Sequence, residues 1–129
     1  MAYANCQASD FFHPRYAELA LMIRHRPNLH RQQWEWIYIL HKLMESGALR
    51  KDARGLVFGV GVEPLPALFA SMGIFVTATD APPGSEGNEG WVATSQYGHS
   101  VGALLQPEIA SDEVVRRLVE HRVCDMTLR

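Results

Sequence analysis

The segment Arg54–Pro82, RGLVFGVGVEPLPALFASMGIFVTATDAP, has the residue pattern of a strand, a glycine turn, a helix and a second strand. Its first part, Gly55–Val60, is a short apolar run rich in β-formers, which is typical of a parallel strand buried on both faces. Pro64–Met72 then carries apolar residues at helical spacing, and Gly73 follows where a helix often needs a residue of positive φ. Phe75–Thr79 returns to β-type sequence. The segment therefore predicts one βαβ unit.

Three residues of this unit are candidates for binding a nucleoside cofactor. Gly59 and Gly61 permit a tight turn and a close approach of backbone to ligand, since a Cβ at either position would hinder both. Asp80 ends the second strand, where Rossmann-like proteins place a carboxylate that accepts hydrogen bonds from a ribose diol. Asp80 is equally suited to cap the turn before Pro82. The glycine turn ahead of it favours ribose binding.

Length and composition set broad limits on the function. The chain has 129 residues, of which 47% are hydrophobic, and a formal net charge of −2. These values predict a globular chain with a sizeable hydrophobic core and no membrane span. Without a long basic block, no nucleic-acid partner is expected. Cys6 and Cys124 lie far apart and no signal peptide precedes them, so a cytoplasmic location is predicted.

Two helices are predicted ahead of the βαβ unit, and one helix and one strand after it. The first two are Pro14–His25 and Asn28–Ser46, the second capped by Asn28 itself. Beyond the loop-like stretch Ala81–Tyr97, the last two are Glu108–His121 and Arg122–Met126. Alternating helices and strands imply parallel strands with right-handed crossovers. The fold class is therefore α/β, a Rossmann-like partial parallel sheet of three strands in the order 3-2-1.

The residues after the glycine turn bear on which cofactor binds. In the dinucleotide pattern GxGxxG the third glycine packs the helix close to a pyrophosphate, and here that position is Pro64. Glu63 would also place a negative charge near two phosphates. S-adenosylmethionine carries no phosphate but has a sulfonium and an amino group, which tolerate a carboxylate. The turn therefore favours S-adenosylmethionine over NAD or FAD, and measurable NAD binding would revive a dehydrogenase-type interpretation.

The stretch Gly55–Asp80 resembles the first motif and second strand of class I S-adenosylmethionine-dependent methyltransferases. The most specific part is GVGVEPLPALFA, which is similar to a bacterial subgroup whose turn reads GVGxEPLPA. The aromatic pattern Trp34-Glu35-Trp36 belongs to the same likeness, which extends from Gln33 to the C-terminus. The residue pattern predicts that residues 1–50 form a helical segment, and the resemblance implies that residues 51–129 form the N-terminal half of a truncated Rossmann-like methyltransferase domain.

The resemblance also implies roles for individual residues. Gly59 and Gly61 would line the cofactor, and Asp80 would bind the ribose hydroxyls. Asp125 stands where many family members carry an acid near the adenine amino group, although a solvated acid near the chain end fits equally well. The neighbouring Met126 would pack on the adenine ring.

Two positions depart from the family pattern. Val57 replaces an acid that often precedes the first glycine, and Glu63 replaces the third glycine of GxGxG. Both changes leave open how the methionine end of the cofactor is held. Glu63 is a candidate for binding its amino group, and the catalytic residues are not identified.

The chain ends just after the predicted third strand, whereas the family fold places a fourth strand beside the first. We therefore expect a truncated domain in which the first strand is an edge with unpaired backbone groups. Such an edge favours a homodimer or a partner chain. The second hypothesis for the function is accordingly a non-catalytic Rossmann-like scaffold or interaction module that assembles through this edge. The methyl acceptor is not indicated by either hypothesis.

Other residue clusters favour less specific roles. Trp91, Tyr97 and His99 lie in or beside the loop after Asp80, where loops often close over a ligand, and we expect them to cover the cofactor. The six histidines are scattered without metal-ligand spacing, so no metal site is predicted.

Overall fold

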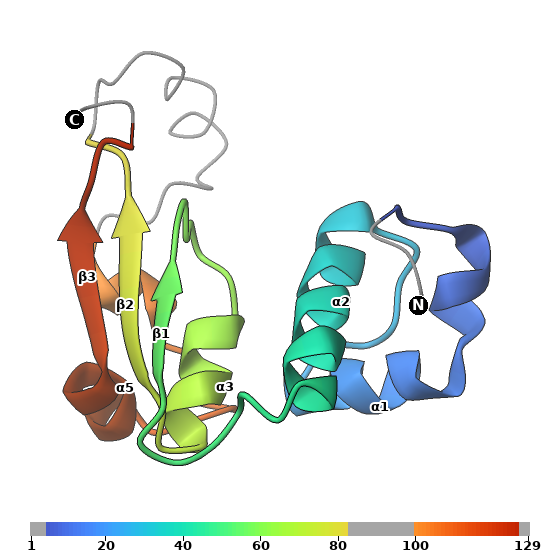
Figure 1. Ribbon diagram of the computed structural model, residues 1–129, viewed down its shortest axis with the longest axis horizontal. Helices are drawn as coiled ribbons and strands as arrows, with labels where there is room; N and C mark the ends of the chain where they lie inside the picture. The colour runs from blue at the N-terminus through green and yellow to red at the C-terminus, as the bar shows by residue number, and fades with distance from the viewer. Residues whose placement is uncertain (1–4, 83–99, 127–129) are drawn as a thin grey trace. The chain divides into compact units, whose positions relative to one another are not determined.

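The computed structural model describes residues 5–82 and 100–126 of the chain (Figure 1). Two compact units make up the chain, Met1–Leu49 and Arg50–Arg129, and each is described by itself. In the part of the chain that is described, no helix is both long and apolar enough to cross a membrane.

The first unit is helical, with η1 (Ala8–Phe12), α1 (Pro14–Met22) and α2 (Arg31–Glu45). The predicted start of the second helix at Asn28 is wrong. His30 is the N-cap, and its Nδ1 accepts a hydrogen bond from the Gln32 N–H at 3.2 Å. The Asn28 N–H instead donates to Gln33 Oε1 at 2.9 Å, because Asn28 belongs to the connection that leads into the helix.

Polar contacts join the elements of this helical unit. The hydroxyl of Tyr16 on α1 donates to Gln33 Oε1 on α2 at 3.0 Å, and Gln33 Nε2 donates to the Arg26 carbonyl at 2.9 Å. Burial raises the pKa of Tyr16 to about 12, so the phenol stays protonated and keeps donating. The indole N–H of Trp34 donates to the buried Asp10 carboxylate at 2.9 Å. These contacts give the unit a specific packing in addition to its apolar core.

The second unit contains a parallel sheet of three strands. The strands are β1 (Arg54–Val57), β2 (Phe75–Asp80) and β3 (Val119–Val123), in the order β1-β2-β3. This order confirms the predicted α/β fold with a three-strand parallel sheet after two helices. The crossover from β1 to β2 contains α3 (Leu65–Ser71), and the segment before β3 contains η2 (Val101–Leu104) and α5 (Asp112–Leu118).

Helices cover one face of the sheet. α3 packs against β2 and against α5. Side chains alternate between the two faces of a strand, and on the covered face Val76, Ala78 and Val119 are buried. The core of this unit therefore lies between the sheet and these helices.

The C-terminal boundaries differ from the prediction of a helix over Glu108–His121 and a strand over Arg122–Met126. The helix is shorter, because the Ser111 hydroxyl caps its start by accepting from the Val114 N–H at 3.3 Å. It ends where Val119 turns extended, with φ −110°. The strand consequently begins at Val119, since this β-branched residue packs into the sheet rather than extending the helix.

Gly73 positions the return of the chain from α3 into β2. Its φ is +77°, a left-handed conformation that side chains with a Cβ rarely adopt, as the sequence predicts for this position. Its N–H donates to the Ala70 carbonyl, and its own carbonyl accepts from the Asp52 N–H at 2.9 Å, just before β1. Gly73 therefore couples the end of α3 to the start of the sheet.

We expect Gly73→Ala to lower the free energy of unfolding by about 1–2 kcal/mol, because alanine would be held in the left-handed region. The new Cβ would lie 3.1 Å from Lys51 Cγ, a flexible side chain that can shift, so the backbone conformation dominates the effect. Gly55→Ala is the matched control, since a Cβ there meets nothing within 4 Å. Urea denaturation measures both, and equal stability of the two variants would contradict the prediction.

Candidate functional site

The candidate cofactor residues gather at one edge of the sheet. The three strands run parallel, so their carboxyl ends lie together, as the arrowheads in Figure 1 show. The turn that carries Gly59 and Gly61 follows β1, and Asp80 is the last residue of β2. Ligands of open α/β sheets bind outside the carboxyl ends of the strands.

The Asp80 carboxylate is hydrogen-bonded directly to the glycine turn. Its Oδ2 accepts from the Gly61 N–H at 3.1 Å, and its Oδ1 accepts from the Ala81 N–H at 3.1 Å. Asp80 is buried, with an exposed fraction of 9%. The structure therefore shows Asp80 in the turn-capping role that the sequence left open beside ribose binding. A carboxylate oxygen has two lone pairs and can accept from more than one donor.

Both glycines adopt the backbone conformation that favours glycine. The φ angles of Gly59 and Gly61 are +59° and +55°. A Cβ on Gly59 would meet nothing within 4 Å, so the requirement at this position is conformational and not one of space.

Two further hydrogen bonds fasten the end of β1 and the turn after it to β2, and sequence reasoning missed both. The Val60 N–H donates to the Thr79 carbonyl at 2.9 Å. The Thr79 hydroxyl donates to the Val57 carbonyl at 3.0 Å. The sequence signal for the second bond was the threonine directly before Asp80, because a threonine hydroxyl can donate to a neighbouring carbonyl.

The remaining candidates occupy the same edge. Asp125 lies just beyond β3, next to Cys124, whose N–H donates to the Asp80 carbonyl at 2.8 Å. Asp125 and Glu63 are half-buried, whereas Met126 has an exposed fraction of 64%. Glu63 follows the glycine turn, where its N–H reaches the Val60 carbonyl at 3.5 Å. The fold thus brings Gly61 and Asp80 into direct contact and leaves Glu63, Asp125 and Met126 as neighbours along the edge.

Some predicted residues cannot be compared with the structure. Trp91, Tyr97 and His99 lie outside the described residues. Within residues 5–82 and 100–126, no three His, Cys, Asp or Glu side chains are grouped so that they could hold a metal ion.

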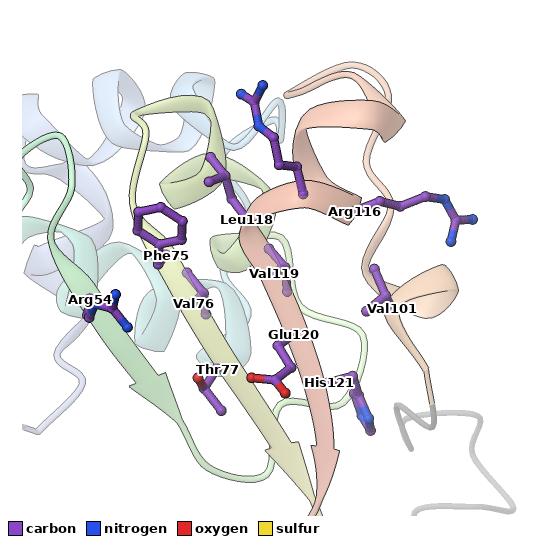
Figure 2. A pocket seen from close by; sticks show the side chains of 11 residues that line it. Arg54, Phe75, Val76, Thr77, Val101, Arg116, Leu118, Val119, Glu120 and His121 are labelled. Atoms are coloured by element: carbon purple, nitrogen blue, oxygen red, sulfur yellow. The ribbon is translucent and has the colours of Figure 1, made fainter.

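A hollow of about 510 Å³ lies elsewhere, over the amino-terminal ends of the strands (Figure 2). Its lining includes Arg54, Phe75 and Val119, which are the first residues of β1, β2 and β3. The hollow is thus separate from the carboxyl-end edge that holds Asp80.

Comparison with known proteins identifies no relative: no protein-family model, curated protein or solved structure matches this chain. The likeness to methyltransferases therefore rests on the sequence motif quoted above.

We expect Asp80→Ala to lower the free energy of unfolding by about 1–3 kcal/mol without any ligand, because the Gly61 and Ala81 N–H groups lose their acceptor. Asp80→Asn should lose less, since its amide oxygen can still accept from Gly61. Urea denaturation of both variants against the parent chain measures the difference. Unchanged stability of Asp80→Ala would show that these hydrogen bonds do not hold the turn.

Proposed function

We propose that this chain binds S-adenosylmethionine at the carboxyl ends of β1 and β2, as the cofactor-binding part of a class I methyltransferase. The observation that carries the proposal is the direct contact between the Gly61 N–H and the Asp80 carboxylate. This contact puts a positive-φ turn and a carboxylate side by side at the edge where parallel sheets bind nucleosides.

Each candidate residue has a chemical task in this proposal. The Asp80 carboxylate holds the turn and also accepts from the ribose diol, since a carboxylate oxygen can accept from more than one donor. Asp125 accepts from the adenine amino group, and Met126 covers the adenine ring with its exposed thioether. Glu63 stands within reach of the turn as an acceptor for the amino group of the methionine end.

The reaction in this proposal moves a methyl group from the sulfonium of S-adenosylmethionine to a nucleophile on an acceptor. Such transfer is accelerated mainly by holding the two reactants in line. In this proposal the residues at the carboxyl-end edge hold the cofactor in position for the transfer. The methyl acceptor and any catalytic residue are not part of the proposal.

Isothermal titration of S-adenosylhomocysteine into the chain tests this function. We expect measurable binding, weakened at least about tenfold in Asp80→Asn, because a hydrogen bond to a charged group contributes about 1.5–3 kcal/mol. Glu120→Gln is the control, since Glu120 is an exposed carboxylate of β3 paired with Arg122. Absence of binding by a chain that unfolds cooperatively would contradict the proposal, and NAD binding instead would support a dehydrogenase-type site.

A second candidate function, assembly through the edge of β1, is favoured by the backbone of that strand. Ala53 and Val57 direct their carbonyls toward β2, where they accept from the Phe75 N–H and the Thr79 hydroxyl. By the alternation of a strand, Arg54 and Leu56 direct their N–H and C=O groups to the opposite side. Among the described residues β2 is the strand that pairs with β1. A second copy could pair there by exchanging equivalent hydrogen bonds.

Leu56→Pro tests this assembly, because it removes an outward N–H and leaves the pairing with β2 intact. We expect the parent chain to dimerise with rising concentration in analytical ultracentrifugation and the variant to remain monomeric. Circular dichroism checks that the variant is folded. A parent chain that is monomeric at every concentration would exclude assembly through β1.

A further inference from the structure

The face of the sheet opposite α3 carries apolar side chains in contact with solvent. Figure 2 shows this face, with Phe75, Thr77 and Leu118 toward the viewer and α3 behind the strands. Leu56 and Phe75 have exposed fractions of 58% and 39%. Purely parallel sheets occur almost only with both faces covered, since helices pack on each side. In the described part of the second unit, α3 and α5 pack together, and this second face is bare.

Positively charged side chains border this face. Arg54, Arg116 and Arg117 line the hollow, and among residues 5–82 and 100–126 no ion pair involves them. The carboxylate of Glu120 is hydrogen-bonded to Arg122 at 2.8 Å, so this pair adds no net charge. A local excess of cations stands out on a chain whose formal net charge is −2.

The cations lie on opposite sides of the apolar strip. In Figure 2, Arg54 stands at the β1 side of the hollow and Arg116 at the α5 side, with Phe75 and Leu118 between them. The Arg54 guanidinium lies 5.5 Å from the centre of the Phe75 ring, which orients this cation over the strip. The surface thus combines an apolar floor with basic rims.

We propose that this open face binds an amphipathic helix of another protein, with an apolar stripe toward the sheet and acidic residues on both flanks. The dimensions agree, because β1 and β3 are separated by two strand spacings, about 9.5 Å, and a helix with its side chains is about 10–12 Å wide. Leu56, Phe75 and Leu118 contact the stripe. Arg54 on one rim and Arg116 and Arg117 on the other pair with the acidic flanks.

The proposal is independent of cofactor binding, because the open face and the Asp80 edge use different residues. It also differs from pairing along β1, which uses the outward backbone groups of that strand. A helix on the open face makes side-chain contacts and needs no backbone hydrogen bond from the sheet. The affinity of the acidic helix for the open face falls as the salt concentration rises, because salt screens the charge pairs with the arginines.

Two synthetic peptides of 14 residues test the proposal by fluorescence anisotropy with the full chain. Both are helical with a leucine stripe, and one carries glutamate on its flanks where the other carries lysine. We expect the glutamate peptide to bind at least about tenfold more tightly, a difference of about 1.4 kcal/mol. The double variant Arg116→Glu/Arg117→Glu should reverse this preference. Leu56→Ser should weaken the glutamate peptide without reversing it.

The double variant Arg26→Glu/Arg31→Glu is the matched control, because it changes the net charge by the same amount at two arginines that do not line the hollow, and it should leave the preference unchanged. Thermal unfolding by circular dichroism checks each variant. Equal affinity for the two peptides, no binding of the glutamate peptide by a folded chain, or an unchanged preference in Arg116→Glu/Arg117→Glu would each overturn the proposal. A concentration-dependent dimer that this variant abolishes would assign the face to a second copy, and would overturn it as well.

Discussion

The hydrogen bond from the Gly61 N–H to the Asp80 carboxylate joins the turn after β1 to the end of β2. It works together with the bond from the Val60 N–H to the Thr79 carbonyl, so two consecutive residues of the turn are held by two consecutive residues of the strand. A buried carboxylate needs such partners, because desolvation without hydrogen bonds is costly. The arrangement of the candidate site therefore depends on an acid that already has a structural task.

In the methyltransferase hypothesis the Asp80 carboxylate has two tasks, holding the turn and binding the ribose. A carboxylate that holds its own turn is already oriented by that contact, and such preorganisation lowers the cost of binding a ligand. The same contact would exist in a protein that binds no nucleoside. Stability measured without ligand and affinity for S-adenosylhomocysteine are thus separate properties of one residue, and the conservative Asn substitution distinguishes them.

The sheet has two surfaces with different physical character. Its carboxyl-end edge is built from hydrogen-bonded backbone and buried polar groups, which suits a small polar ligand. Its open face combines exposed Leu56 and Phe75 with basic side chains, which suits a macromolecular surface. Because apolar area in water is unfavourable, a partner that covers Leu56 and Phe75 would be stabilised by their burial.

The sequence by itself determined the βαβ unit, the parallel strand order and the left-handed Gly73, because these follow from local periodicity and from the conformational freedom of glycine. It misplaced the boundary between α5 and β3, since Val119 suits either a helix or a strand and packing against β2 decided between them. Only the tertiary structure decided that Asp80 bonds to Gly61 and that Arg54 and Arg116 border the same strip. These residues are far apart in the chain, and only strand pairing and helix packing bring them together.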